Sequence, residues 1–115
     1  MLLGLRSAIY PVKDLAAAKA WYEQLLGFPP YFDEPFYVGF EVGGYELGLL
    51  PDGSRTDTLW GVENIQQAWE AMLEKGARPL DEPKDVGGGI WVASLLDPQG
   101  NALGIIENPH FKLAR

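Results

Sequence analysis

The sequence predicts a single α+β domain made of two similar halves, each with the order strand–helix–strand–strand–strand. Three observations carry this prediction. In two stretches, apolar residues recur at three- and four-residue steps, which is typical of amphipathic helices. Other stretches alternate apolar and polar residues or form short apolar runs, which favour strands. Gly and Pro account for 14 and 9 of the 115 residues, so the elements are separated by many turns.

The first half opens with a strand and a helix. Residues 5–12 form a short apolar run, which predicts a strand. Asp14 has the side chain of a helix N-cap, and Gly27 suits the left-handed residue that ends a helix. A helix over residues 15–26 is therefore expected. Its apolar face comprises Leu15, Ala18, Trp21, Tyr22, Leu25 and Leu26.

A hairpin follows the first helix. Residues 36–42 alternate with a period of two, and residues 45–50 form the returning strand. Gly43-Gly44 between them predicts a tight hairpin turn. Residues 51–54 form a turn or linker, because they read Pro-Asp-Gly-Ser.

The same order of elements then starts again. Residues 58–62 predict a strand, and Asn64 with Gln67 three residues later resembles a capping box. The helix that follows carries the apolar stripe Ile65, Ala68, Trp69, Met72 and Leu73, and Gly76 closes it. The rest is expected to be extended over 77–83, 90–96 and 102–107, with turns at 87–89 and 97–100.

Three short matches show that the second half repeats the first. Residues 12–15, 33–35 and 47–50 correspond in the same order to residues 62–65, 81–83 and 103–106. Three matches in one order are unlikely to be coincidence. We therefore expect one domain over residues 1–115, with repeat units of about 1–53 and 54–115.

Composition excludes several functions. The formal net charge is −7 with no basic run, which argues against binding the phosphate backbone of nucleic acids. No apolar stretch is long enough to span a membrane, and the first residues do not form a signal peptide, so a cytoplasmic protein is expected. There are no cysteines and one histidine, His110, which excludes disulfides, cysteine-ligated metals and a two-histidine site within one chain.

The repeat and several short motifs resemble the vicinal-oxygen-chelate superfamily, which includes glyoxalase I, bleomycin-resistance proteins, fosfomycin-resistance enzymes and extradiol dioxygenases. The matching stretches are residues 11–15, 18–28, 60–64, 97–101 and 104–109. The resemblance implies a curved, mostly antiparallel, eight-stranded incomplete barrel with the helices on its outer face. It does not specify an activity, because the fold carries lyases, isomerases, dioxygenases and non-catalytic drug binders.

Metal-dependent members of that superfamily carry four ligands on the concave face of the sheet. By resemblance, the corresponding positions here are Ser7, Gly48, Asp57 and Gly104. A register shifted by two residues would replace Gly48 with Glu46. Neither set offers an imidazole, and glycine offers no side-chain ligand, so we expect neither a metal nor another cofactor.

The concave face is then expected to bind a small molecule. We expect Asp57 to contact a cationic group, unless it is only a solvated aspartate beside Arg55. Trp91 and Tyr37 are expected to flank the ligand, whereas Trp21, Trp60 and Trp69 are expected in the core. The predicted cavity comprises Ser7, Ile9, Tyr37, Gly48, Asp57, Leu59, Trp91 and Gly104, with no catalytic residue among them.

Three functions remain open at this point. The first is a metal-independent binding protein for a cationic or aromatic small molecule, since the acidic charge and the aromatic residues suit such a ligand. The second is a lyase-, isomerase- or dioxygenase-type enzyme with an atypical metal site. The third is a dimeric interaction module. In each case a homodimer is expected, because exposed sheet edges favour pairing. The sequence leaves open whether the units pair within one chain or swap between chains, and what His110 does.

Overall fold

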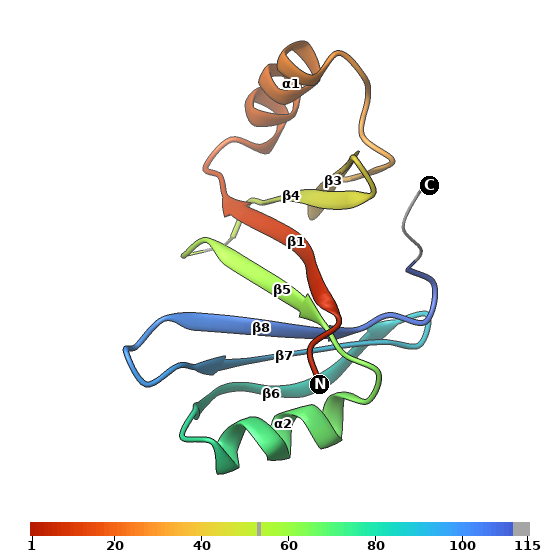
Figure 1. Cartoon of the computed structure of the whole chain (residues 1–115). Helices are drawn as coiled ribbons and strands as arrows, with labels where there is room; N and C mark the ends of the chain where they lie inside the picture. Colours follow the sequence, from red (N-terminus) through yellow and green to blue (C-terminus); the bar gives the residue numbers. More distant parts are fainter. Residues whose placement is uncertain (53, 112–115) are drawn as a thin grey trace. The chain divides into compact units, whose positions relative to one another are not determined.

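The computed structural model describes residues 1–52 and 54–111. It contains two helices and eight strands in the order expected from the repeat (Figure 1). The elements are β1 (Gly4–Pro11), α1 (Leu15–Leu26), β2 (Phe32–Glu34), β3 (Tyr37–Val42), β4 (Tyr45–Leu50), β5 (Asp57–Gly61), α2 (Ile65–Glu74), β6 (Arg78–Gly87), β7 (Ile90–Leu96) and β8 (Ala102–Glu107). The α+β class and the two βαβββ repeats are thus confirmed.

Contacts along the chain define two compact units, each with four strands and one helix. The N-terminal unit comprises residues 7–52 and 54–57, and the C-terminal unit comprises residues 1–6 and 58–111. The division follows the two repeats except at two places: the first three residues of β1 belong to the C-terminal unit, and residues 54–57 belong to the N-terminal unit. That the whole chain forms a single domain stays a prediction.

The N-terminal unit has the strand order β2-β3-β4-β1. The β2–β3 and β3–β4 pairs are antiparallel, and β1 pairs with β4 in parallel. The predicted hairpin joins β3 to β4 through Gly43 and Gly44, with φ of +60° and +92°, which side chains other than glycine rarely tolerate. Asp14 caps α1 by accepting a hydrogen bond from the Ala17 N–H.

Alternation along β3 and β4 gives the sheet of this unit two different faces. One face carries the buried residues Val38, Phe40 and Leu49, and α1 packs against it through Leu15, Ala18, Tyr22 and Leu26. The prediction that Trp21 lies in the core is wrong, because it is 57% exposed. The inward positions of α1 are one stripe at three- and four-residue steps, and Trp21 lies beside this stripe, edge-on to Tyr22.

The C-terminal unit has the strand order β5-β8-β7-β6, with β5–β8 parallel and the other pairs antiparallel. Asn64 caps α2 by accepting from the Gln67 N–H, as the sequence predicts. The helix packs on β7 and β8 around Trp69, Met72, Leu95 and Ile105. Trp69 is buried and Trp60 partly buried against this core, so both predictions are confirmed.

Within residues 1–52 and 54–111, neither helix is long and apolar enough to cross a membrane.

One strand is longer than expected, because β6 continues to Gly87 instead of ending near Pro83. Its pairing with β7 shifts register three times, which is how a strand accommodates extra residues.

Candidate functional site

The sheet face of the N-terminal unit opposite α1 carries a carboxylate, Glu46, bound by three hydroxyl groups. Glu46 accepts from Ser7 Oγ at 2.8 Å and from the Tyr37 hydroxyl at 2.8 Å on Oε1, and from the Tyr31 hydroxyl at 2.5 Å on Oε2. The donors come from β1, from β3 and from the loop before β2, three separate parts of the chain. We call Ser7, Tyr31, Tyr37 and Glu46 the Glu46 cluster.

Strand register explains how these side chains meet. Ser7 on β1 lies directly opposite Glu46 on β4, so both side chains point to the same face of the sheet. Two residues further along β4, Gly48 pairs with Gly39 on β3. A β-carbon at Gly48 would overlap the Tyr37 hydroxyl, and one at Gly39 would lie 2.8 Å from Glu46 Oε2. The paired glycines therefore make room for the tyrosines and for the carboxylate.

Both tyrosines of the cluster are held as neutral hydrogen-bond donors. Burial raises the pKa of Tyr37 well above its usual range, and the charge of Glu46 raises it further. Burial of the hydroxyl end, followed by the hydrogen bond to Glu46, also raises the pKa of Tyr31, although the residue as a whole is 63% exposed. Around neutral pH both phenols keep the proton that they donate to Glu46.

Glu46 has no cationic partner within the described part of the chain. The ion pairs Lys19–Asp33 and Arg55–Asp57 do not involve it. Glu46 is half-buried, and its charge is stabilised by hydrogen bonds to neutral hydroxyls. Such a carboxylate keeps its electrostatic attraction for a positively charged group.

Four of the predicted cavity residues belong to this face of the N-terminal unit. Ser7 is 8% exposed and donates a hydrogen bond to Glu46. Tyr37 on β3 also donates a hydrogen bond to Glu46. Ile9 lies opposite Gly48, two residues after Ser7 on β1. The space beside Gly48, which the sequence suggests is open to a ligand, is occupied by the Tyr37 hydroxyl.

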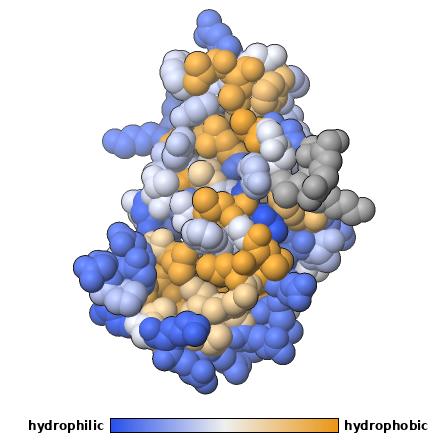
Figure 2. Space-filling view, in the orientation of Figure 1, coloured by the Kyte–Doolittle hydropathy of each residue, from blue (hydrophilic) through white to orange (hydrophobic). Residues whose placement is uncertain are grey.

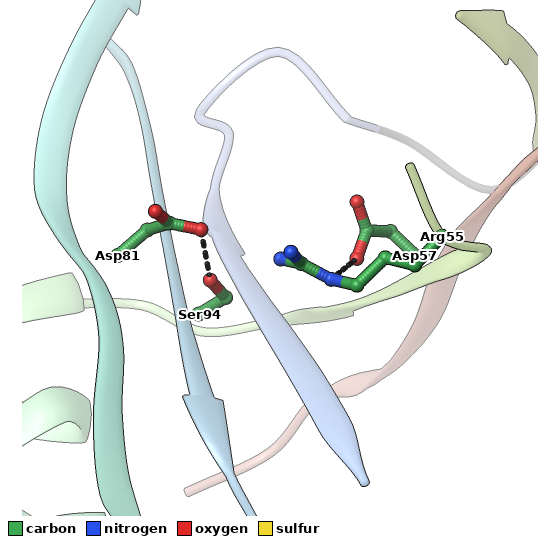
Figure 3. Close-up of polar contacts among 4 residues, drawn as sticks. All are labelled: Arg55, Asp57, Asp81 and Ser94. Atoms are coloured by element: carbon green, nitrogen blue, oxygen red, sulfur yellow. Dashed lines mark hydrogen bonds and ion pairs between the residues drawn. The ribbon is translucent and has the colours of Figure 1, made fainter. Parts of the chain in front are cut away.

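Asp57, the carboxylate favoured by the sequence, has a cation of its own. Arg55 Nε lies 2.9 Å from Asp57 Oδ1 in the N-terminal unit, and Figure 3 shows the two side chains turned toward each other. In the C-terminal unit, Ser94 Oγ donates a hydrogen bond to Asp81 Oδ2 at 2.7 Å, and this contact is drawn in Figure 3. Asp57 thus forms an ion pair with an arginine two residues before it in the sequence, whereas Glu46 has no such partner among the described residues.

The remaining predicted residues lie in the C-terminal unit. Leu59 on β5 lies opposite Gly104 on β8, and a β-carbon at Gly104 would meet Leu59 Cδ2 and the Thr58 carbonyl oxygen. Gly104 is therefore needed for close packing rather than for an open space. Trp91 is 37% exposed and lies on the same face of β7 as Ala93 and Leu95, because residues two and four apart on a strand point to one side. This face packs on α2. His110 forms a 2.7 Å hydrogen bond from Nε2 to the Gly88 carbonyl oxygen, within the C-terminal unit.

The residues at the four family ligand positions do not fit a divalent metal ion. Ser7 is bound to Glu46, Gly48 and Gly104 have no side chain, and Asp57 is paired with Arg55. Among residues 1–52 and 54–111 there is no group of three His, Cys, Asp or Glu side chains placed to hold a metal. Three hydroxyl groups already surround Glu46, so this carboxylate does not complete such a set either.

Sequence reasoning reached Glu46 only as the alternative register, and it missed Tyr31 and Gly39. One signal was present in the sequence. Gly39 and Gly48 each interrupt a strand of otherwise large residues, and a glycine inside a strand often marks a close approach by another group. No comparable local signal marks Tyr31, because it lies in a loop whose path depends on the rest of the unit.

Comparisons with known proteins agree with this architecture. A variant of methylmalonyl-CoA epimerase from Streptomyces coelicolor, in complex with 2-nitronate-propionyl-CoA, is 16% identical with a TM-score of 0.79, over 99% of this chain and 100% of that chain. A glyoxalase/bleomycin resistance protein/dioxygenase superfamily member from Vibrio splendidus 12B01 is 18% identical with a TM-score of 0.70, over 90% and 99%. An NAD-dependent benzaldehyde dehydrogenase structure from Legionella pneumophila is 18% identical with a TM-score of 0.72, over 87% and 96%.

Identities this low show a shared fold and not a shared activity. No curated protein sequence matches the chain. The model of one family, described as Glyoxalase/Bleomycin resistance protein/Dioxygenase superfamily, matches residues 4–105, which is most of the chain. With the two βαβββ repeats, this match confirms the resemblance seen in the sequence: the chain belongs to the glyoxalase/bleomycin resistance protein/dioxygenase superfamily.

Proposed function

We propose that this protein binds a small organic molecule without a metal ion, and that the ligand presents a cationic group and an aromatic ring to the Glu46 cluster. The observation that carries the proposal is the Glu46 carboxylate, which is held by three neutral hydroxyls and has no cationic partner among the described residues. The sequence predicts a cationic or aromatic ligand, and the proposal combines the two features in one molecule. The anchoring carboxylate is Glu46 in place of Asp57.

The chemistry of the cluster suits such a ligand. A carboxylate offers about four lone-pair positions, and the three hydroxyls occupy three of them. An ammonium group can use the remaining position, and a hydrogen bond between charged groups contributes roughly 1.5–3 kcal/mol. The rings of Tyr31 and Tyr37 add faces on which an aromatic ring or a cation can lie. Because the hydroxyls already hold the carboxylate, little side-chain entropy is lost on binding.

The test is a calorimetric titration of three compounds of similar shape, namely benzylammonium, benzyl alcohol and benzoate. We expect benzylammonium to bind most tightly. Glu46→Gln should weaken it by about tenfold or more, because the charged hydrogen bond is lost. The same variant should leave benzyl alcohol nearly unchanged.

Two variants with the same change of charge serve as controls. Asp52 is exposed in the turn after β4 and belongs to neither the Glu46 cluster nor its paired strands, so Asp52→Asn should have little effect. Asp57→Asn removes the carboxylate favoured by the sequence, and a larger loss there than in Glu46→Gln would move the site to Asp57. Equal losses for benzylammonium and benzyl alcohol in Glu46→Gln would show that Glu46 is only structural. About one tightly held metal ion per chain in elemental analysis would contradict the metal-independent part of the proposal.

We also propose that the protein is a homodimer. Support comes from exposed apolar residues of the N-terminal unit, including Trp21 and Leu25 of α1 at 57% and 63% exposure. Figure 2 shows apolar surface in orange where Figure 1 places α1. Association would remove such side chains from water. Analytical ultracentrifugation at micromolar concentration should give twice the chain mass, and a monomer mass alone would contradict the homodimer.

A further inference from the structure

A small hollow lies in the C-terminal unit, and none of the residues that line it belongs to the Glu46 cluster. Its volume is about 100 Å³. Two polar side chains line it, Arg6 and Asn108, and the apolar residues Leu3, Val62, Ile106 and Phe111 form much of the rest. The lining thus combines polar and apolar side chains.

Arg6 brings a positive charge to this hollow that no carboxylate of the described chain neutralises. Its guanidinium lies over the Phe111 ring, 4.0 Å from the ring centroid. One of its donors, Nη1, reaches the Leu5 carbonyl oxygen at 3.3 Å. Within residues 1–52 and 54–111, no Asp or Glu oxygen lies within 4.0 Å of the guanidinium. The guanidinium has five N–H donors in all, so most of them remain for another acceptor.

Gly61 and Asn108 shape the hollow around that charge. A β-carbon at Gly61 would lie 2.7 Å from Arg6 Nε, so the guanidinium rests where a side chain at this position would be. The Asn108 carbonyl oxygen Oδ1 accepts from the His110 N–H at 2.9 Å. This bond uses the amide oxygen, and the NH₂ group of Asn108 is the part of the side chain that can donate.

We propose that the hollow binds the carboxylate of a short-chain organic acid. The planar fork of Arg6 matches a carboxylate through two parallel hydrogen bonds, and the Asn108 NH₂ group adds a third donor. The alkyl chain lies against the apolar residues. A volume of about 100 Å³ suits an acid of a few heavy atoms.

The test titrates the full chain with sodium propionate at constant ionic strength, and follows the Gly61 amide and the Arg6 Nε–H by NMR. We expect saturable shifts with a dissociation constant in the millimolar range. Arg6→Gln should weaken binding by about tenfold or more. Arg6→Lys keeps the charge but loses the fork, so it should also bind more weakly, as should Asn108→Ala.

Controls separate this hollow from general charge and from the Glu46 cluster. Arg78→Gln makes the same change of charge at an exposed position of β6 in the same unit, and should leave the propionate titration unchanged. Glu46→Gln should also leave it unchanged, so failure here and failure of the proposed function are distinguishable. Inorganic phosphate lacks the alkyl chain and should bind more weakly than propionate.

Three results would overturn the proposal. Shifts that never saturate in the wild-type protein would show that the hollow binds no carboxylate. If Arg78→Gln and Arg6→Gln weaken propionate binding equally, the binding depends on the net charge of the protein and not on the position of Arg6. Phosphate that binds as tightly as propionate at the Gly61 amide would show recognition of anions in general and not of a short-chain carboxylate.

Discussion

Phe40→Ala is expected to lower the free energy of unfolding by about 3–5 kcal/mol, the range for removing a large aromatic side chain from a core. Phe40 is fully buried, and its ring lies 6.4 Å from that of Tyr22 and 6.5 Å from that of Phe28, between centroids. It is the largest buried side chain of the N-terminal unit, whose core contains few fully buried residues. Phe40→Ala would therefore leave a cavity that the few buried side chains around it cannot fill.

Urea denaturation followed by circular dichroism measures this change through the shift of the midpoint. Val42→Ala is the matched control, because Val42 is on the same strand and the same face of the sheet but is 38% exposed. It should cost far less. If the two variants are equally stable, Phe40 does not hold the core that positions β3 and β4.

Gly48→Ala is expected to destabilise the protein by about 1–3 kcal/mol and to disrupt the Glu46 cluster. The new methyl group would overlap the Tyr37 hydroxyl and lie 2.6 Å from the ring carbon that bears it. Tyr37 must then move, which breaks its hydrogen bond to Glu46. Because the anchoring carboxylate is no longer held in place, benzylammonium binding should fall with stability.

A double-mutant cycle with Tyr37→Ala isolates the clash. In the Tyr37→Ala background the ring is absent, so adding Gly48→Ala should cost almost nothing, and the two substitutions should be strongly non-additive. Urea denaturation of the four proteins provides the coupling energy. Additive losses would mean that Gly48 is required for the backbone of β4 and not for the position of Tyr37.

The elements themselves could be predicted because their signals are local. Asp14 and Asn64 lie directly before periodic apolar stripes, and both accept the expected hydrogen bond from the backbone N–H three residues on. Gly43 and Gly44 adopt the positive φ that a tight hairpin requires. The predicted apolar face of α1 included too many residues. Tyr22 packs inward and Trp21 is exposed, and their aromatic type alone does not distinguish them.

The candidate site could be predicted only in part. Through Ser7 and Gly48, the resemblance led to the face of the N-terminal unit that carries the Glu46 cluster, and the residues at the family ligand positions predict that no metal is bound there. Sequence reasoning favoured Asp57 as the anchoring carboxylate, because the spacing of the repeats does not reveal that Arg55 pairs with it. Sequence reasoning did not predict that tyrosines donate to Glu46. Tyr31 is 15 residues from Glu46 in sequence, so their hydrogen bond depends on where the loop before β2 lies.

The sequence by itself determined the superfamily, the two repeats and the limits of most helices and strands. These depend on caps, turns and periodicity, which act over a few neighbouring residues. Only the tertiary structure decided which carboxylate is anchored and which arginine lines a hollow. The pairing of β1 with β4 places Ser7 opposite Glu46, and the approach of Phe111 to Arg6 joins residues from the two ends of the chain. A one-residue change of register would send each strand's side chains to the other face, so no local pattern could have settled these contacts.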